Sequence, residues 1–221
     1  MSTQSLPLSA VSTTSSTTIC AVQSFASVLR NHLGERAWSE LAPDIRARFA
    51  TYISEEQHLL FAGRMQWVYC SPIGALLMRL LRRFSILPAM CARDCDFDFD
   101  IGMDAGEIVK QRRYALDADR QFVFRSRFSD LPQLHEEFAG GIGMYLDLAV
   151  KHGALLFRDR GYFWRWRHWR LRLPRWLNVG RFELLHRNID SRRYQIIIRV
   201  AHPLLGTLFY QRGEFYREVR S

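Results

Sequence analysis

The chain has 221 residues, of which 48% are hydrophobic and 24% charged, and its formal net charge at pH 7 is +9. This length predicts one domain with a core large enough to fold without disulfide or metal cross-links. No apolar run approaches the roughly 20 residues that a membrane-spanning helix needs, which argues against such a helix. The basic balance favours a polyanionic partner, nucleic acid or an anionic membrane surface, unless the arginines only cover the solvent face of strands.

The first residues differ in composition from the rest. Residues 1–23 are rich in Ser and Thr, and no basic residue precedes Arg30. Secretory signals and mitochondrial transit peptides both carry basic residues. We therefore expect a disordered leader over residues 1–23 and a single domain over residues 24–221. The expected location is cytoplasmic, extending to the periphery of a membrane.

The cysteines do not have the spacing of a metal site. Cys20, Cys70, Cys91 and Cys95 form no CxxC pair, and the last two are poorly spaced for a zinc ribbon. We interpret all four as reduced thiols. Neither a metal nor a cofactor is expected.

Helical periodicity occurs in three places before residue 90. Two short helices are predicted over residues 24–33 and 38–49. The clearest amphipathic helix follows Ser71 and Pro72, which are typical of a helix start. Its apolar residues recur every three or four positions as far as Phe84. We expect this helix to cover the concave face of a sheet.

An alternating pattern begins after residue 90. Acidic and apolar residues alternate in the order Asp94, Cys95, Asp96, Phe97, Asp98, Phe99, Asp100 and Ile101. This is typical of a strand with one wet and one buried face. We expect a turn centred on residues 102–106. The return strand then brings Lys110 near Asp100. It brings Arg112 near Asp98, so that these pairs relieve the like charges. A metal ion shared by two aspartates is the alternative.

Short alternating segments continue to residue 217, without a helical stretch between them. Such spacing is typical of an antiparallel meander. The predicted fold class is α+β. It consists of a curled antiparallel sheet or half-barrel of seven or more strands, with N-terminal helices and one amphipathic helix packed on it.

The most aromatic and basic stretch covers residues 162–172, YFWRWRHWRLR. Its alternation changes phase near His168, which predicts a β-bulge. As a functional surface, the stretch would lie in a membrane interface or stack on bases. As a structural strand, it would point tryptophans into the core and arginines into solvent. The candidate ligand-binding residues are Trp164, Trp166, Trp169, Arg165 and Arg167.

No catalytic motif is apparent in the sequence. It contains no HExxH or GxSxG, and residues 140–143 lack the Lys-Ser/Thr that follows the glycines of a phosphate loop. We therefore favour a protein that is not an enzyme. An enzymatic role would fall to His135, Glu136 and Asp98, a set that no motif supports.

Several short motifs occur in a fixed order. They include Leu41-Ala42-Pro43-Asp44-Ile45-Arg46, Leu173-Pro174-Arg175-Trp176-Leu177, His202-Pro203-Leu204-Leu205-Gly206 and Tyr210-Gln211-Arg212-Gly213. Together they resemble the mainly bacterial domain-of-unknown-function family numbered 4166, over about residues 33–215. Members of that family often carry a Trp after the Gly-Glu pair that is Gly106-Glu107 here, whereas this chain has Ile108.

The resemblance implies no established activity. Relatives in the family are similar to domains appended to NAD-binding, saccharopine-dehydrogenase-like modules. This chain contains no GxGxxG motif, so it resembles a stand-alone member.

Three functions remain open. The preferred one is a non-catalytic binding module for an apolar or lipid-like ligand, at an anionic membrane surface, because a curled sheet with a helix across it commonly encloses an apolar cavity. The second is an accessory domain to an oxidoreductase, or a cryptic enzyme. The third is nonspecific nucleic-acid binding, which no recognised motif supports.

Overall fold

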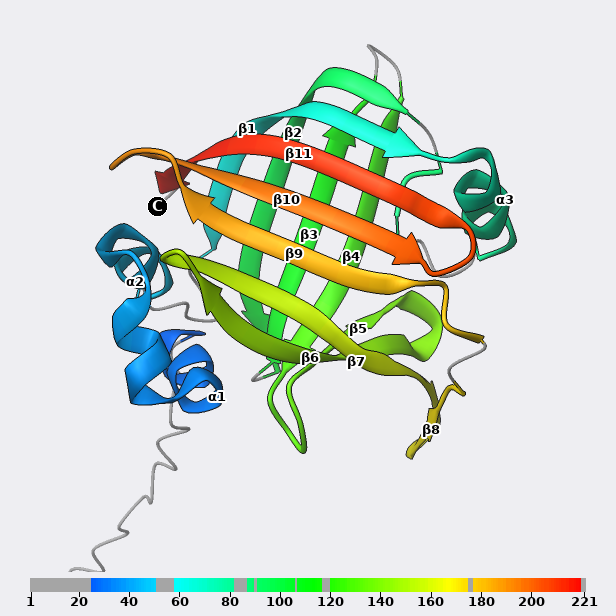
Figure 1. The fold of residues 1–221 in the computed structure, drawn as a ribbon, viewed down its shortest axis with the longest axis horizontal. Helices are drawn as coiled ribbons and strands as arrows, with labels where there is room; N and C mark the ends of the chain where they lie inside the picture. The colour runs from blue at the N-terminus through cyan, green and yellow to red at the C-terminus, as the bar shows by residue number, and fades with distance from the viewer. Residues whose placement is uncertain are drawn as a thin grey trace, which may run out of the picture.

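Figure 1 shows the computed structural model of the chain, which describes residues 25–50, 58–81, 87–89, 91–105, 107–116, 120–174 and 177–219. The helices are α1 (Phe25–Glu40), α2 (Pro43–Phe49), α3 (Pro72–Leu80) and a 3₁₀ turn, η2 (Ala139–Gly141). The strands are β1 (Leu59–Cys70), β2 (Ala92–Asp104), β3 (Glu107–Ala115), β4 (Gln121–Ser129), β5 (His135–Phe138), β6 (Ile142–Lys151), β7 (Ala154–Trp166), β8 (Trp169–Arg172), β9 (Arg181–Asn188), β10 (Arg193–His202) and β11 (Gly206–Val219). The predicted leader lies outside the described residues.

The described strands form a closed antiparallel barrel of ten strands. They neighbour one another in the order β6-β5-β4-β3-β2-β1-β11-β10-β9-β7, and β6 pairs with β7 to close the ring. The remaining strand, β8, pairs with β7 and forms a hairpin at the barrel's edge. The predicted α+β half-barrel is therefore wrong. Closure gives a partner to the two edge strands that a half-barrel would leave with unpaired backbone groups.

Aromatic side chains fill much of the barrel interior. Tyr114, Phe128, Tyr194 and Phe215 are almost completely buried. The Phe215 ring lies 5.3 Å from that of Phe97 and 5.4 Å from that of Tyr194. Such ring pairs add favourable edge-to-face and stacked contacts to the burial of apolar surface. The core therefore lies inside the barrel.

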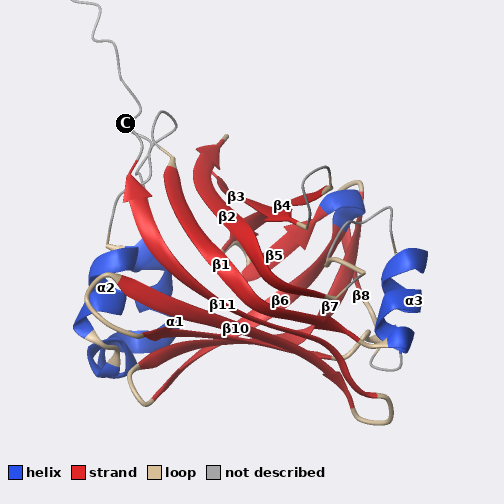
Figure 2. Cartoon of the chain, turned by 90° about the horizontal axis from the view of Figure 1, so that it is seen from above, coloured by secondary structure: helices blue, strands red, loops and turns tan. Residues whose placement is uncertain are grey.

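The helices lie at the two ends of the barrel, as Figure 2 shows. At one end, the α1 residue Phe25 contacts the rings of Phe49 in α2 and Phe128 in β4, at 5.2 and 5.0 Å. Among the described residues, no helix is long and apolar enough to cross a bilayer.

The amphipathic helix does not cover a concave sheet face. Helix α3 lies at the other end of the barrel, with Ser71 as its N-cap. Its residues Ile73, Leu76 and Leu80 are exposed. The prediction was wrong because a closed barrel leaves no open concave face to cover. The predicted continuation of this helix as far as Phe84 lies outside the described residues.

The hairpin between β2 and β3 differs from the predicted one by a single residue. Asp104 lies opposite Glu107, so the turn is shorter than predicted. Asp98 therefore lies opposite Arg113, with which it forms an ion pair, instead of near Arg112. Asp100 lies opposite Gln111, instead of near Lys110. Because side chains alternate between the two faces of a strand, this shift points Lys110 and Arg112 into the barrel.

Candidate functional site

A charged cluster is buried inside the barrel. On β3, the buried residues Ile108, Lys110, Arg112 and Tyr114 alternate with more exposed ones. The Arg112 guanidinium donates a hydrogen bond to Glu136 Oε1 on β5 at 2.8 Å. The Lys110 ammonium lies 3.7 Å from Glu136 Oε2. The cluster thus combines two cations with one carboxylate.

Neighbouring polar and aromatic groups hold this cluster in place. Ser126, on the strand between the two partners, accepts a hydrogen bond from Arg112 at 2.8 Å and donates one to Glu136. The Lys110 nitrogen lies 3.9 Å from the centre of the Phe128 ring. The Arg112 guanidinium lies 5.0 Å from the Phe124 ring. Ring faces attract cations and replace part of the lost hydration.

Burial and neighbouring charges shift the pKa values of Glu136 and Lys110. Burial alone would raise the pKa of Glu136, but the charges of Lys110 and Arg112 and the bond from Ser126 outweigh it and lower the pKa to about 2. For Lys110, burial is the stronger effect and lowers the pKa to about 8, although Glu136 acts in the opposite direction. Both groups are therefore mostly charged at neutral pH.

A second polar group lies at the end that α1 and α2 cover. His186 of β9 is buried, and its ring stacks on Tyr194 at 4.7 Å. Burial, and then the charge of Arg48, lower the pKa of His186 well below its usual value. The ring is therefore neutral, and its Nε2 accepts a hydrogen bond from Arg48 at 2.7 Å. Arg48 also donates to Asn188.

Two cavities lie on either side of the charged cluster. The smaller, of about 70 Å³, is lined by Phe25 and Phe49 at the end that the helices cover, and also by Lys110. The larger, of about 250 Å³, extends towards α3 and the segment after β8. Arg112 and Glu136 line both cavities and so form part of the wall between them.

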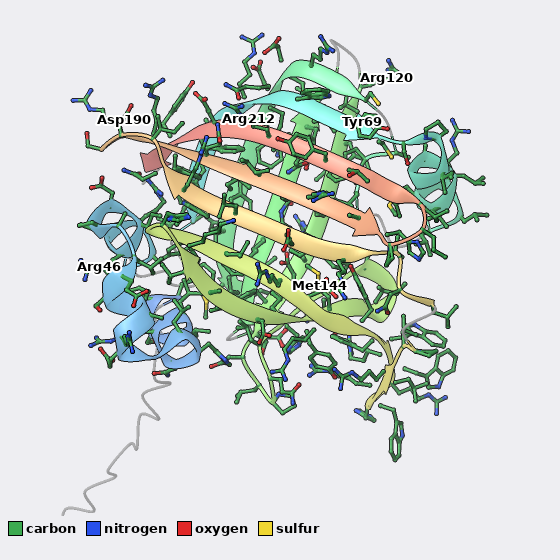
Figure 3. The ribbon with its side chains drawn as sticks, viewed as in Figure 1. Arg46, Tyr69, Arg120, Met144, Asp190 and Arg212 are labelled. Atoms are coloured by element: carbon green, nitrogen blue, oxygen red, sulfur yellow. The ribbon has the colours of Figure 1, made fainter. Side chains whose placement is uncertain are left out.

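The larger cavity is mostly apolar. Its lining includes Met78 from α3, Phe124 from β4, Val200 from β10 and Leu177 after β8. Met144 lines it from β6, and Figure 3 labels this residue among the side chains of the barrel. Apart from Arg112 and Glu136, none of its lining residues is charged. This lining suits an apolar molecule with one polar end.

The five candidate ligand-binding residues lie outside this cavity. The three tryptophans share one face of the β7–β8 hairpin, because Trp166 lies opposite Trp169, and Trp164 opposite Leu171. All four side chains are exposed, and Trp169 is 74% exposed. The predicted bulge near His168 is replaced by a two-residue turn, in which Arg167 has a φ of 51°.

The two arginines of the predicted set, Arg165 and Arg167, have different surroundings. Arg165 points to the other face of β7 and forms an ion pair with Glu137 of β5. Arg167 lies in the turn. The predicted set is therefore divided between an exposed tryptophan face, a salt bridge and a turn.

The tryptophan face continues the lining of the larger cavity. Tyr162 and Leu173 line that cavity, and the Leu173 amide donates to the Tyr162 carbonyl at 2.8 Å. Residues two apart on a strand share a face. Trp164 and Leu171 therefore follow on the same side, and Trp166 continues the row to the tip. This apolar row leads from the cavity to the surface.

The three residues suggested for an enzyme do not converge. Glu136 faces the barrel interior, whereas its neighbour His135 contacts the Tyr145 and Phe163 rings on the other side of the sheet. Asp98 is paired with Arg113 on the outer wall. In the described part of the chain, no group of three acidic, His or Cys side chains is arranged to hold a metal ion.

Lys110 and Arg112 were not predicted to be interior residues. The signal was present, because both share the alternation of Ile108 and Tyr114 on one strand. Their charge favoured a solvent-facing assignment, which was wrong.

Comparisons with known proteins match the chain to one family model. It is described as a domain of unknown function, DUF4166, and it matches residues 41–215. No curated protein and no solved structure matches the chain. The match covers most of the chain, including α2 and the strands from β1 to most of β11. The chain therefore belongs to the DUF4166 family.

Proposed function

We propose that this chain is a non-catalytic module that binds an apolar, lipid-like molecule inside its barrel. The observation that carries this proposal is the larger cavity of about 250 Å³, whose lining is apolar apart from Arg112, Glu136 and the hydroxyl-bearing Tyr162. This volume is just below the roughly 300 Å³ at which small-molecule pockets begin. Water gains few hydrogen bonds against such walls, so an apolar molecule is the favoured occupant.

The arrangement of polar groups also favours binding over catalysis. Glu136 Oε1 accepts bonds from both Ser126 and Arg112, and its charge is stabilised by Lys110. A general base needs a pKa near the working pH, whereas the pKa of this carboxyl is lowered to about 2. The buried carboxylate is thus suited to holding the two cations in position.

The first test is native mass spectrometry of gently purified protein, followed by extraction and identification of any bound molecule. The expected result is a lipid-like molecule at one per chain. A mass that always equals that of the bare chain, with no uptake of added apolar molecules, contradicts the proposal. That outcome favours an accessory role beside an oxidoreductase.

A pair of variants locates the binding site. Val200→Phe fills part of the larger cavity, because Val200 is buried and lines it. Val123→Phe makes the same change on the outer wall, where Val123 is 42% exposed. We expect the first variant to lose the apolar ligand and the second to keep it. If both variants retain the ligand equally well, the ligand binds elsewhere.

We further propose that the molecule is exchanged at an anionic membrane surface. The β7–β8 hairpin and α3 lie at the same end of the barrel (Figures 1 and 2). The hairpin carries the exposed Trp166 and Trp169, and α3 carries the exposed Leu76 and Leu80. Residues 72–80 and 161–174 contain five arginines and no acidic residue. Tryptophan is suited to the bilayer interface, and arginine is attracted to anionic lipid.

Vesicle sedimentation tests this membrane contact. The protein is mixed with phosphatidylcholine vesicles that either contain or lack phosphatidylglycerol. We expect binding to the anionic vesicles, and we expect Trp166→Ala with Trp169→Ala to weaken it. Tyr216→Ala removes a half-exposed aromatic residue near the end of β11, which Figure 1 shows at the opposite end of the barrel, and should leave binding unchanged. Binding that depends on neither the lipid charge nor the two tryptophans contradicts the proposal.

A further inference from the structure

We infer that the ligand carries a single carboxylate, and that Lys110 and Arg112 bind this carboxylate at the wall between the two cavities. The inference rests on the proposed function, because it specifies the polar end of the molecule that the barrel binds.

The charges buried inside the barrel are not balanced. In the buried cluster at the wall between the two cavities, two cations, Lys110 and Arg112, face one carboxylate, that of Glu136. Charges removed from water need a partner of opposite sign, and a monoanion supplies the charge that the cluster lacks.

The surroundings of Lys110 leave room for another hydrogen-bond acceptor. An ammonium group has three hydrogen-bond donors. Its nitrogen lies 3.7 Å from Glu136 Oε2, beyond the usual range of about 2.7–3.2 Å. The centres of the Phe25 and Phe128 rings, which accept no conventional hydrogen bond, lie 5.5 and 3.9 Å from the nitrogen. With respect to the described residues, donors therefore remain for a ligand that enters the smaller cavity, which Lys110 lines.

Positive charge decreases along the barrel from the helix-covered end. Lys110, Arg112 and Glu136 all line the smaller cavity of about 70 Å³ near that end, among mostly apolar residues, whereas Lys110 does not line the larger cavity. The larger cavity is apolar beyond the wall of Arg112 and Glu136 and extends towards the tryptophan face. A molecule with a small anionic head and an alkyl chain matches this gradient. Its carboxylate would lie at the cationic end, and its chain would point towards α3 and the hairpin.

The experiment compares two probes that differ only at the polar end, decanoic acid and 1-decanol. Isothermal titration calorimetry at neutral pH, below the micelle concentration, gives the affinity of each. We expect the wild-type chain to bind decanoate at least roughly tenfold more tightly, since a hydrogen bond to a charged group contributes that much or more. Equal affinity for the acid and the alcohol overturns the inference and leaves the proposed function intact.

Two matched variants locate the effect. Lys110→Met removes the buried cation with little change of volume, and Lys151→Met makes the same change at the exposed end of β6. We expect Lys110→Met to lose the tenfold preference for decanoate while still binding decanol, and Lys151→Met to keep it. Unchanged preference in Lys110→Met overturns the inference. If the wild-type chain binds neither probe, the proposed function fails as well, which separates the two outcomes.

Discussion

The Arg112 guanidinium of β3 reaches past β4 and donates a hydrogen bond of 2.8 Å to Glu136 on β5. Ser126, on the intervening strand, bonds to both of them. Three adjacent strands are therefore connected through side chains inside the barrel as well as through their backbones. Since all three side chains are buried, the loss of one partner leaves the others without hydration or a counter-charge.

Glu136→Gln should destabilise the fold strongly. The change leaves the buried cations Lys110 and Arg112 without their carboxylate, and breaking a buried ion pair from one side costs about 3 kcal/mol or more. Urea unfolding at pH 7 measures this loss in the free energy of unfolding. Glu183→Gln, which disrupts an exposed pair with Arg158, is the control and should change stability by less than about 1 kcal/mol. Similar values for the two variants would show that the cluster is not a buried electrostatic unit.

Lys110→Met should have the opposite effect and stabilise the fold at pH 7. Burial lowers the pKa of Lys110 to about 8 from 10.5, so the folded chain disfavours the charged ammonium. Glu136 still keeps Arg112 and Ser126 as partners. Replacing a buried charge by an apolar side chain of similar volume then raises the free energy of unfolding by about 1–3 kcal/mol. A destabilised Lys110→Met variant would contradict this account.

The same shift of pKa predicts how stability depends on alkaline pH. Between about pH 8 and pH 10.5 the unfolded chain keeps the Lys110 proton, whereas the folded chain has released it. Stability rises with pH wherever the unfolded state binds more protons. The wild-type chain should therefore gain stability over this window relative to Lys110→Met. Urea midpoints of both proteins at several pH values measure the difference, and parallel curves would show that Lys110 does not titrate as described.

Acid should weaken the fold through Glu136. The pKa of its carboxyl is lowered to about 2 from 4.5 in the folded chain. Its contribution to stability is therefore fully present above about pH 4.5 and lost as the pH falls towards 2. The wild-type chain should lose about 3 kcal/mol more than Glu136→Gln over this window. Thermal unfolding of both proteins at pH 5 and pH 3 compares the two slopes, and equal slopes would refute the assignment.

The position of the candidate site could have been predicted from strand β3 alone. An error of one residue in the predicted pairing of β2 with β3 hid it. The alternation of Ile108, Lys110, Arg112 and Tyr114 assigns all four to one face. A pairing register predicted one residue off placed the two cations opposite aspartates on the outer wall. Because the repeat of a strand is two residues, an error of one residue is enough to move a side chain from the solvent to the core.

Closure of the barrel could not be read from local patterns in the same way. The strands and their antiparallel order follow from alternation and turns, but the ring closes through contacts between residues far apart in the chain. Strand β1 pairs with β11, at the opposite end of the sequence, and β7 pairs with β9 as well as with β6. Nothing in the alternation of a single strand indicates whether its free edge has a partner. The number of strands was therefore easier to predict than the closed shape.

Gly143→Ala should loosen the pairing that closes the ring. A methyl group at Gly143 on β6 would lie 2.2 Å from the Phe163 ring on β7 and 2.9 Å from the Glu136 carbonyl. Overpacking of this kind costs about 1–3 kcal/mol, and amide hydrogen exchange should become faster in β6 and β7. The double variant with Phe163→Leu separates this clash from a general cost of alanine, because a smaller side chain relieves it. We expect the double variant to recover part of the stability that Gly143→Ala loses. If the losses of the two single variants simply add, the Phe163 ring does not restrict the space at Gly143.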